Sequence, residues 1–329
     1  MSLLPLTFAC WDYDRIKALQ DGAVRAEGID LNILPLRVEE TFFRALRGAE
    51  FDVCELSLSS YLMTLDDERP PYVAIPVFPS RFFRLQSIYV NTDRVGSPVD
   101  LIGKRVGCPE YQLTACVWQR GTLADHYGVP VDGVEYVTGA LTGSRPRDEK
   151  VRLDLPPGIR VSSIAEGQNL SDMLAAGEID ALYTAPAPLT FGVAPNVRRL
   201  FEDFVAVEKE YFARTRIFPI MHVVAIRSDI HERHPWVARS LTKAFDASLA
   251  IAKAGLRETS ATKVMLPWLQ RHVEETVDAL GEDYWDYGIA RNRHVLETFA
   301  RYSYEQGLSR RLRSPEDLFV PGIDVGFVI

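Results

Sequence analysis

The sequence predicts an α/β protein of two lobes, in which the chain leaves the first lobe and later returns to it. Short apolar runs alternate with amphipathic helical patterns, a rhythm typical of parallel βαβ units. The chain has 329 residues, enough for two domains. A strongly apolar run at residues 218–226 follows the second set of elements and is expected to rejoin the first sheet.

The first lobe is predicted to hold residues 1–96 and 217–329. Helical patterns continue to residue 26 after the first strand and cover residues 38–47 before Gly48. From residue 234 the pattern is mostly helical and aromatic, and these helices are expected to cover the first lobe, with one leaning across the hinge. The expected strands are residues 6–10, 29–34, 51–56, 73–78 and 86–91.

The second lobe is predicted to hold residues 97–216, from Ser97-Pro98 onward. A helix is expected at about residues 114–127, and another at residues 171–176 that Gly177 ends. Residues 143–158 are rich in charge, proline and glycine and predict an exposed loop, whose Arg145 and Arg147 belong to a solvated charge run or to a lid. The expected strands are residues 105–108, 134–138 and 179–184.

Composition excludes several classes of function. A net charge of −8 argues against nucleic acid or an anionic membrane surface as a partner. No apolar run approaches the roughly 20 residues that span a bilayer, and the first residues lack a basic and then apolar export signal, which predicts a cytoplasmic protein. The four cysteines have no CxxC spacing and are expected to be buried thiols.

Residues 100–115, Asp-Leu-Ile-Gly-Lys-Arg-Val-Gly-Cys-Pro-Glu-Tyr-Gln-Leu-Thr-Ala, predict a strand, a loop and a helix start. Such a loop offers free backbone N–H groups to an anion. The stretch resembles the opening of the second lobe in the type 2 periplasmic-binding-protein fold, which implies a ligand cleft between the lobes. Four segments are expected to face that cleft: residues 11–14, 55–60, 111–114 and 183–185.

Four segments taken in order resemble the 4,5-dihydroxyphthalate decarboxylase family. They are Cys-Trp-Asp-Tyr-Asp-Arg at residues 10–15, Asp-Val-Cys-Glu-Leu-Ser-Leu-Ser-Ser at 52–60, Ile-Pro-Val-Phe-Pro-Ser-Arg-Phe-Phe-Arg at 75–84 and Phe-Pro-Ile-Met-His at 218–222. The resemblance runs along nearly the whole chain. It implies decarboxylation of a hydroxylated aromatic carboxylate, 4,5-dihydroxyphthalate to 3,4-dihydroxybenzoate in the named case, and it leaves the substrate of this chain open.

The chemistry defines what the site needs. A carboxylate para to a phenol leaves as CO2 once the ring carbon that bears it is protonated, and the phenol oxygen takes up the positive charge by losing its proton. The site therefore needs an acid near the ring carbon, an acceptor near the phenol, and cationic or N–H anchors for a second carboxylate. No redox cofactor is expected, and a divalent metal is left open.

His222 is the first candidate for the acid, because histidine exchanges protons near neutral pH and this one lies in an apolar strand. The alternative is a core histidine bonded to backbone. Glu55 at the end of a strand is expected to accept the phenol proton, with a pKa raised by water exclusion, or to cap a neighbouring helix. Asp12, with Asp14, is expected to orient a phenol or histidine, or to cap the next helix. His231 and His234 have the spacing of a metal pair, but their flanking charges favour an exposed helix start, so no metal site is predicted.

The predicted substrate contacts form one set, although each also has a structural alternative. An arginine fork holds a carboxylate, and a phenylalanine or tryptophan can stack on an aromatic ring. The serines donate to a ligand oxygen or cap the next helix. The set is Trp11, Ser57, Ser59, Arg81, Phe82, Arg84, Tyr111, Gln112, Thr114 and Tyr183.

Together these observations predict a cofactor-independent decarboxylase acting on a small aromatic carboxylate in an interlobe cleft. His222 protonates the ring, Glu55 or Asp12 receives the phenol proton, and Arg81 with the Thr114 loop anchors carboxylate. The alternative is a non-catalytic binding protein for a small organic anion. Aromatic C-terminal helices permit a homo-oligomer, although core packing explains them equally well.

Overall fold

The computed structural model describes residues 2–143 and 149–323, and the chain divides into two compact units. Unit 1 comprises Met1–Arg81, Phe212–Leu296 and Ser314–Ile329, and unit 2 comprises Phe82–Tyr211 and Glu297–Arg313. The division at Arg81 falls earlier than the lobe boundary predicted near residue 97, because the next strand pairs within unit 2.

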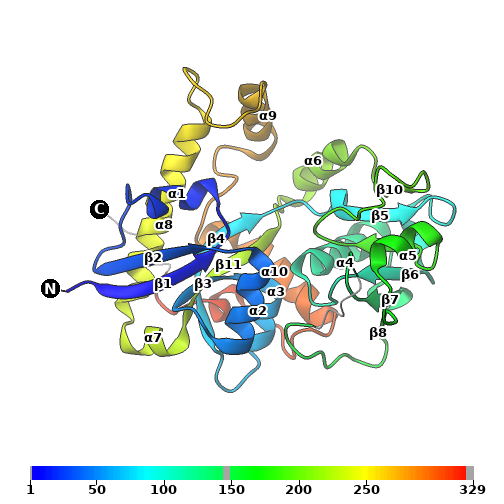
Figure 1. Cartoon of the computed structure of the whole chain (residues 1–329), viewed down its shortest axis with the longest axis horizontal. Coiled ribbons are helices and arrows are strands. Elements are labelled where there is room, and N and C mark those ends of the chain that lie inside the picture. Colours follow the sequence, from blue (N-terminus) through cyan, green and yellow to red (C-terminus); the bar gives the residue numbers. More distant parts are fainter. Residues whose placement is uncertain (1, 144–148, 324–329) are drawn as a thin grey trace. The chain divides into compact units, whose positions relative to one another are not determined.

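Unit 1 is built on a mixed sheet with the strand order β2-β1-β3-β11-β4 (Figure 1). The strand β1 (Leu4–Cys10) runs parallel to β2 (Ile29–Pro35) and to β3 (Val53–Ser57). The returning strand β11 (Ile220–Arg227) inserts antiparallel between β3 and β4 (Tyr72–Arg81). The predicted return of residues 218–226 to the first sheet is therefore confirmed.

The strand β3 is buried at every position, although its sequence Val-Cys-Glu-Leu-Ser includes a carboxylate. Its neighbour β11 reads Ile-Met-His-Val-Val-Ala-Ile-Arg, and the β-branched residues suit a buried strand. A buried charge is tolerated only when it is paired and hydrogen-bonded. Glu55 must therefore find its partners inside unit 1.

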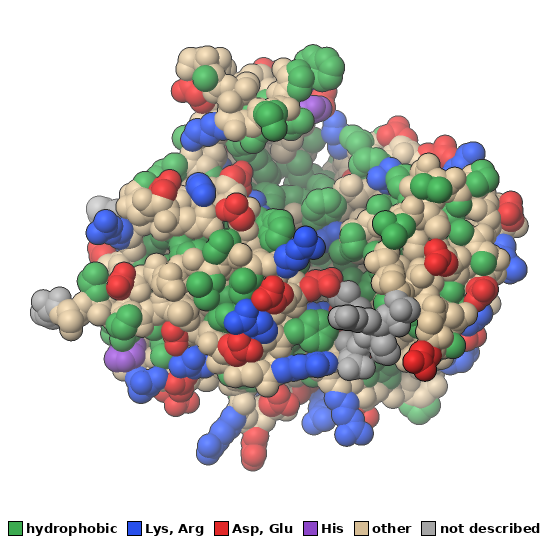
Figure 2. Space-filling view, viewed as in Figure 1, with side chains coloured by type: hydrophobic (Ala, Val, Ile, Leu, Met, Phe, Trp, Pro, Cys, Tyr) green, Lys and Arg blue, Asp and Glu red, His purple; other side chains and the backbone are tan. Residues whose placement is uncertain are grey.

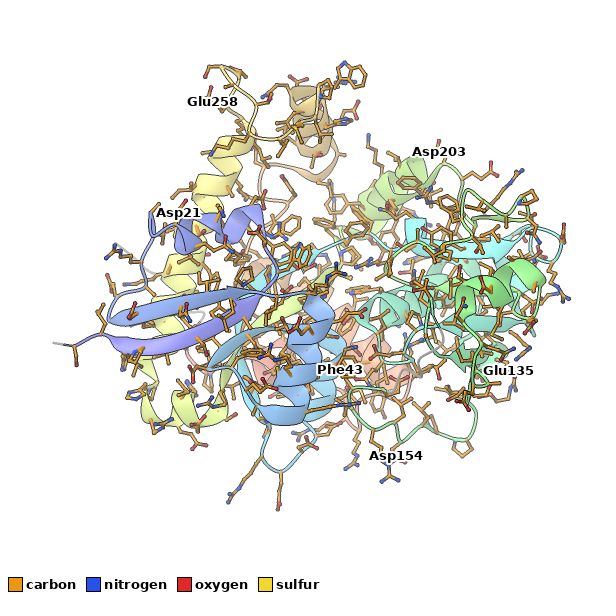
Figure 3. The ribbon with its side chains drawn as sticks, viewed as in Figure 1. Asp21, Phe43, Glu135, Asp154, Asp203 and Glu258 are labelled. Carbon is orange, nitrogen blue, oxygen red and sulfur yellow. The ribbon has the colours of Figure 1, made fainter. Side chains whose placement is uncertain are left out.

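The first helix of unit 1 is shorter than the sequence pattern predicted. It ends at Gln20 rather than near residue 26. The side chain of Asp21, labelled in Figure 3, accepts a hydrogen bond from the backbone N–H of Ala23, and Gly22 adopts a positive φ of 77°, so the chain turns away. The helices and short helical turns of unit 1 are α1 (Asp14–Gln20), α2 (Val38–Gly48), α3 (Leu58–Thr64), α7 (Ser228–Arg233), α8 (Trp236–Leu256), α9 (Leu269–Leu280), the first half of α10 (Ile289–Glu305) and η4 (Pro315–Leu318).

Apolar side chains stay exposed between α8 and α9, where Figure 2 shows green side chains at the top of the view. Met265 and Trp268 are among the exposed large hydrophobic residues of this stretch. Exposed apolar patches are common at interaction surfaces. The homo-oligomer stays a prediction.

Unit 2 carries a second mixed sheet with the order β10-β5-β9-β6-β7-β8. The strands β9, β6, β7 and β8 are parallel, and β5 pairs antiparallel with both β9 and β10. The sequence pattern did not predict β8 or β10, which are short. The strands are β5 (Ile88–Asn91), β6 (Arg105–Cys108), β7 (Glu135–Thr138), β8 (Arg160–Ser163), β9 (Ala181–Tyr183) and β10 (Val197–Arg199).

The helix α4 (Thr114–Tyr127) begins and ends where predicted, and α5 (Leu170–Ala176) ends at Gly177 with a φ of 72°. The helix α6 (Phe204–Thr215) was not predicted. In the described part of unit 2 the 3-10 turns are η1 (Leu85–Ser87), η2 (Pro98–Leu101) and η3 (Val131–Gly133). In the part of the chain that the structure describes, no helix combines the length and apolar character needed to cross a bilayer.

Most of the C-terminal helices belong to unit 1, as predicted, and α10 passes from unit 1 into unit 2, as expected of the one helix predicted to lean across the hinge. The ring of Trp118 on α4 packs against Phe299 and Tyr302 from the second half of α10, with ring centroids 5.1 and 5.6 Å apart. Gly121 permits this approach, because a Cβ atom there would lie 2.3 Å from the Tyr302 ring. Residues 297–313 therefore belong to the core of unit 2.

The buried carboxylate of Glu208 predicts a pH-dependent stability for unit 2. It lies on α6 and accepts hydrogen bonds from the backbone N–H of Gln86 at 2.8 Å and from its Nε2 at 3.2 Å. Burial raises the pKa of Glu208 to about 7, and the hydrogen bonds only partly oppose this. The folded state therefore binds the carboxyl proton of Glu208 more tightly than the unfolded chain does. The stability that this proton contributes is fully present below pH 4.5, the ordinary pKa of the group, and is lost as the pH rises to about 7.

Between pH 4.5 and 7.5 the Glu208 carboxyl is expected to lower the free energy of unfolding of the unmodified protein by on the order of 2–3 kcal/mol. We expect Glu208→Gln not to show this loss, because an amide does not titrate. Urea unfolding at several pH values measures it, with Glu210→Gln, an exposed glutamate on the same helix, as the control. An unchanged pH slope in Glu208→Gln would contradict the assignment.

Candidate active site

The candidate site of unit 1 is built around Glu55, whose side chain is 0% exposed. Its Oε1 accepts a hydrogen bond from the Tyr13 hydroxyl at 2.6 Å and lies 2.5 Å from Nδ1 of His222. Its Oε2 accepts from the backbone N–H of Trp11 at 3.0 Å. Three donors from two segments, residues 11–13 and β11, therefore satisfy one buried carboxylate.

His222 comes from β11, the strand next to β3, and its Cα pairs with that of Ser57. The register between β11 and β4 shifts on both sides of His222. Such bulges redirect a side chain and are frequent beside active sites. Its ring also meets that of Phe42 edge to face, with centroids 4.9 Å apart.

The contact with Glu55 determines what the imidazole can do. A carboxylate at 2.5 Å from Nδ1 makes Nδ1 the donor, which leaves Nε2 as the atom that can exchange a proton with a ligand. The side chain of His222 is 13% exposed, so the imidazole is largely enclosed but not fully buried. A buried carboxylate behind a partly accessible imidazole is an arrangement suited to general acid–base catalysis.

The pKa of Glu55 moves in the direction opposite to the prediction. Burial raises it, but the attraction of His222 and the hydrogen bonds from His222, Tyr13 and the Trp11 amide together lower it below the ordinary value. Both carboxylate oxygens already hold donors, so Glu55 is placed to orient His222 rather than to receive a proton from a phenol.

The sequence did not single out Tyr13 or Arg15, although Tyr13 lies in the segment 11–14 that was expected to face the ligand and Arg15 follows it directly. Burial raises the pKa of the Tyr13 hydroxyl, and the adjacent charge of Glu55 raises it further, so Tyr13 stays a donor. The Arg15 guanidinium lies 3.9 Å from the centroid of the Tyr13 ring and 4.5 Å from that of Trp285. Only the fold brings Trp285 to this position, so no local signal could have found it.

The remaining predicted residues of unit 1 have mixed placements. Trp11 and Asp12 are exposed, next to the Trp11 amide that Glu55 binds. Ser57 is the N-cap of α3 and accepts a hydrogen bond from Ser60 N–H, and Ser59 is fully buried. For Ser57 the structure therefore supports the capping alternative.

Arg81 does not present its guanidinium to a ligand, which corrects the prediction that it anchors a carboxylate. It is buried, and it donates to the backbone carbonyls of Phe218 at 3.1 Å and Asp286 at 2.8 Å, and to the side chain of Asn292. Burial lowers its pKa to about 9. The role of Arg81 in this structure is to fasten the end of β4 to the segment before α10.

Arg84 and Phe82 begin unit 2 and lie together. The Arg84 guanidinium is 4.5 Å from the centroid of the Phe82 ring and donates to the carbonyl of Ala185 at 3.4 Å. The Phe82 side chain is 43% exposed. Phe82 is exposed and Arg84 is partly exposed, so their role as ligand contacts stays a prediction.

The predicted anion-receptive loop of unit 2 is already occupied by a side chain. Tyr111, Gln112, Thr114 and Tyr183 are all buried. The amides of Tyr111 and Gln112 donate to the carboxylate of Glu149 at 2.5 and 3.2 Å. The loop therefore does bind a carboxylate, but in this structure that carboxylate is the side chain of Glu149.

No metal centre is evident among residues 2–143 and 149–323. Within those ranges no three His, Cys, Asp or Glu side chains gather as a metal site would need. His231 and His234 lie at α7 and just after it. Arg145 and Arg147 lie outside the described residues.

Comparison with curated proteins finds close relatives along the whole chain. A protein of Comamonas testosteroni named 4,5-dihydroxyphthalate decarboxylase is 44% identical over 323 residues, which cover 98% of each chain. A protein of Pseudomonas putida with the same name is 45% identical over 205 residues, 62% of this chain and 79% of that protein. No family model matches the chain.

Solved structures confirm the predicted fold class. The alkanesulfonate-binding protein SsuA from Xanthomonas axonopodis superposes with a TM-score of 0.52 at 11% identity, over 97% of this chain and 98% of that one. The periplasmic aliphatic sulphonate-binding protein SsuA from Escherichia coli gives a TM-score of 0.51 at 12% identity, over 97% and 99%. The fold is therefore of the periplasmic-binding-protein type.

Proposed function

The chain belongs to the 4,5-dihydroxyphthalate decarboxylase family, and from this premise we propose that it releases CO2 from a hydroxylated aromatic carboxylate. The best candidate reaction converts 4,5-dihydroxyphthalate to 3,4-dihydroxybenzoate. The observation that carries the mechanism is the 2.5 Å contact between His222 Nδ1 and the buried Glu55.

In the proposed reaction, protonated His222 donates the proton on Nε2 to the ring carbon that bears the carboxylate. The para hydroxyl loses its proton as the ring takes up the positive charge, which gives a dienone. The bond to the carboxylate then breaks, its electron pair restores the aromatic ring, and CO2 leaves. One proton replaces one CO2, and the phenol proton returns to the phenolate or to solvent.

Glu55 supports this step by orienting the imidazole, and its charge complements the imidazolium that the step uses. The exposed Asp12, beside Trp11, is the remaining candidate to receive the phenol proton. A site that excludes water would favour loss of CO2 from the carboxylate. The reaction as proposed uses no metal or cofactor.

The test is incubation of chelator-treated protein with 4,5-dihydroxyphthalate, with product followed by chromatography and released CO2. We expect one CO2 for each 3,4-dihydroxybenzoate formed, at the same rate before and after chelation. Turnover that returns only on metal addition would contradict the metal-free mechanism. Binding without product would favour the anion-binding alternative. The cytoplasmic location stays a prediction.

A further inference from the structure

The Glu55 oxygen that contacts His222 also holds a second donor. Oε1 of Glu55 lies 2.5 Å from Nδ1 of His222 and accepts a hydrogen bond from the Tyr13 hydroxyl at 2.6 Å. Because both donors share one oxygen atom, a shift of the hydroxyl changes the position and the charge that the imidazole meets. A group that fixes the Tyr13 ring therefore acts on His222 as well.

The Tyr13 ring is held by the guanidinium of Arg15. Tyr13 is the N-cap of α1, but its side chain makes no capping hydrogen bond. The guanidinium lies 3.9 Å from the centroid of the Tyr13 ring and 4.5 Å from that of the Trp285 ring. A cation over an aromatic face is attracted to it, and more strongly where water is excluded. The Arg15 side chain is 14% exposed, so the contact is largely shielded from water.

The strand β4 and the helix α8 fix Arg15 and Trp285 in turn. Nε of Arg15 donates to the carbonyl of Pro79 at 2.5 Å, and Nε1 of Trp285 donates to the carbonyl of Phe78 at 3.1 Å. The backbone carbonyl of Arg15 accepts from the Ser248 hydroxyl at 2.8 Å. Two consecutive carbonyls of one strand thus hold both aromatic-stacking partners in place.

The charge of Arg15 also acts on the Tyr13 hydroxyl. Burial raises the pKa of that hydroxyl, the charge of Glu55 raises it further, and the charge of Arg15 opposes both. A cation that makes a phenol more acidic makes its O–H a stronger donor. The carboxylate of Asp14, which pairs with Arg15 at 2.9 Å, is 57% exposed and therefore offsets this charge only weakly.

We propose that Arg15 is a positioning residue, which clamps the Tyr13 ring so that its hydroxyl stays on Oε1 of Glu55 and thereby holds the His222 imidazole in place. The inference rests on the proposed function, in which His222 gives its proton to the ring carbon. In this role Arg15 acts through Tyr13 and does not touch the reacting atoms. All four residues lie in unit 1.

The test is a double-mutant cycle on kcat for 4,5-dihydroxyphthalate. Arg15→Met keeps an unbranched side chain but removes the charge and the donors, and we expect it to lower kcat about three- to tenfold. Tyr13→Phe is expected to lower kcat about tenfold. The variant with both substitutions should equal Tyr13→Phe within about twofold, because without the hydroxyl there is nothing left to position. An unchanged kcat in Arg15→Met, or two losses that multiply, overturns the proposal.

The matched control is Arg44→Met, which also removes an arginine stacked on an aromatic ring of unit 1. The Arg44 guanidinium lies 4.9 Å from the centroid of the Phe51 ring, and its side chain is 40% exposed. Its removal should leave kcat within about twofold of that of the unmodified protein. A loss equal to that of Arg15→Met would indicate a general loosening of unit 1 and overturn the proposal.

Binding of phthalate separates positioning from direct contact with the substrate. Phthalate keeps both carboxylates but lacks the hydroxyls that the reaction needs, and calorimetry measures its affinity. We expect Arg15→Met to change that affinity by less than about threefold, because Arg15 orients a catalytic group and does not hold the ligand. A loss of affinity as large as the loss of kcat would show that Arg15 binds the substrate itself and would overturn the proposal.

Arg15→Lys keeps the cation but not the planar stacking group, so its loss of kcat should be smaller than that of Arg15→Met. A loss as large as that of Arg15→Met would contradict a role for the charge. If Arg15→Met does not fold, Arg15→Lys takes its place in the cycle. Its smaller loss should likewise disappear in the Tyr13→Phe background, and its persistence there overturns the proposal.

The imidazole signal of His222 tests the clamp without turnover. Labelling with ¹⁵N-histidine gives the ring signals of six histidines, and the signal that is absent in His222→Gln belongs to His222. Tyr13→Phe and Arg15→Met should move this signal in the same direction, and the double variant no further than Tyr13→Phe. If the unmodified protein releases no CO2, the decarboxylation is rejected while these shifts still support the clamp. Turnover with an unmoved His222 signal in Arg15→Met keeps the decarboxylation and overturns the role of Arg15.

Discussion

Replacing His222 with Gln is expected to lower kcat for decarboxylation by roughly 10²–10⁴-fold, the range for loss of a general acid. The imidazole is the proton donor in the proposed step, and Gln fills similar space but cannot supply a proton. Binding of phthalate, measured by calorimetry, should change by less than about threefold, because the proposed role of His222 is to transfer a proton during the reaction rather than to hold the ligand.

The matched control is His272→Gln, which removes an exposed histidine from α9 in the same unit. Its kcat and its phthalate affinity should both equal those of the unmodified protein. An equal loss of kcat and of affinity in His222→Gln would reject His222 as the acid and indicate a binding role.

Glu55→Gln is expected to give the second largest effect, a fall in kcat of roughly 10²-fold. The introduced amide has one acceptor oxygen, so it can accept from Tyr13 or from the Trp11 amide but not from both. It also removes the charge that stabilises the imidazolium and no longer enforces a proton on Nδ1. Steady-state kinetics with 4,5-dihydroxyphthalate measure this fall.

The same substitution has a stability signature with a definite sign. Because the pKa of Glu55 is lowered in the folded state, its charge contributes stability that is present above the ordinary value of 4.5 and is lost as pH falls below it. The free energy of unfolding should thus fall less steeply with decreasing pH in Glu55→Gln than in the unmodified protein.

Tyr13→Phe removes one donor and keeps the charge, so it is expected to lower kcat less than Glu55→Gln. A kcat of Glu55→Gln equal to that of the unmodified protein would contradict its assignment.

Much of the architecture follows from local patterns. The apolar run of β11 and the βαβ rhythm of the first hundred residues predicted the sheet of unit 1, and α4 and α5 begin or end close to where their sequences indicated. The strand β5 was assigned to the wrong lobe, because a short apolar run does not specify which sheet it joins.

Arg81 is the clearest case in which the structure differs from the site predicted by the sequence. Its place between aromatic residues, at the end of a strand, suggested a ligand contact. The structure instead surrounds it with two backbone carbonyls and Asn292, which are 137 to 211 residues away in sequence. Acceptors so distant cannot be foreseen from the neighbours of Arg81.

The sequence by itself determined the fold class and the family, and it named a strand-end carboxylate and an apolar-strand histidine as separate candidates. These depend on periodicity, composition and motifs, which are local. Only the tertiary structure decided that Glu55 and His222, 167 residues apart, share a hydrogen bond, that Tyr13 joins them, and that Glu149 occupies the amides of unit 2. The physical reason is that pairing between distant strands and loops is fixed by burial, because each buried charge or N–H must find a partner wherever the fold brings one.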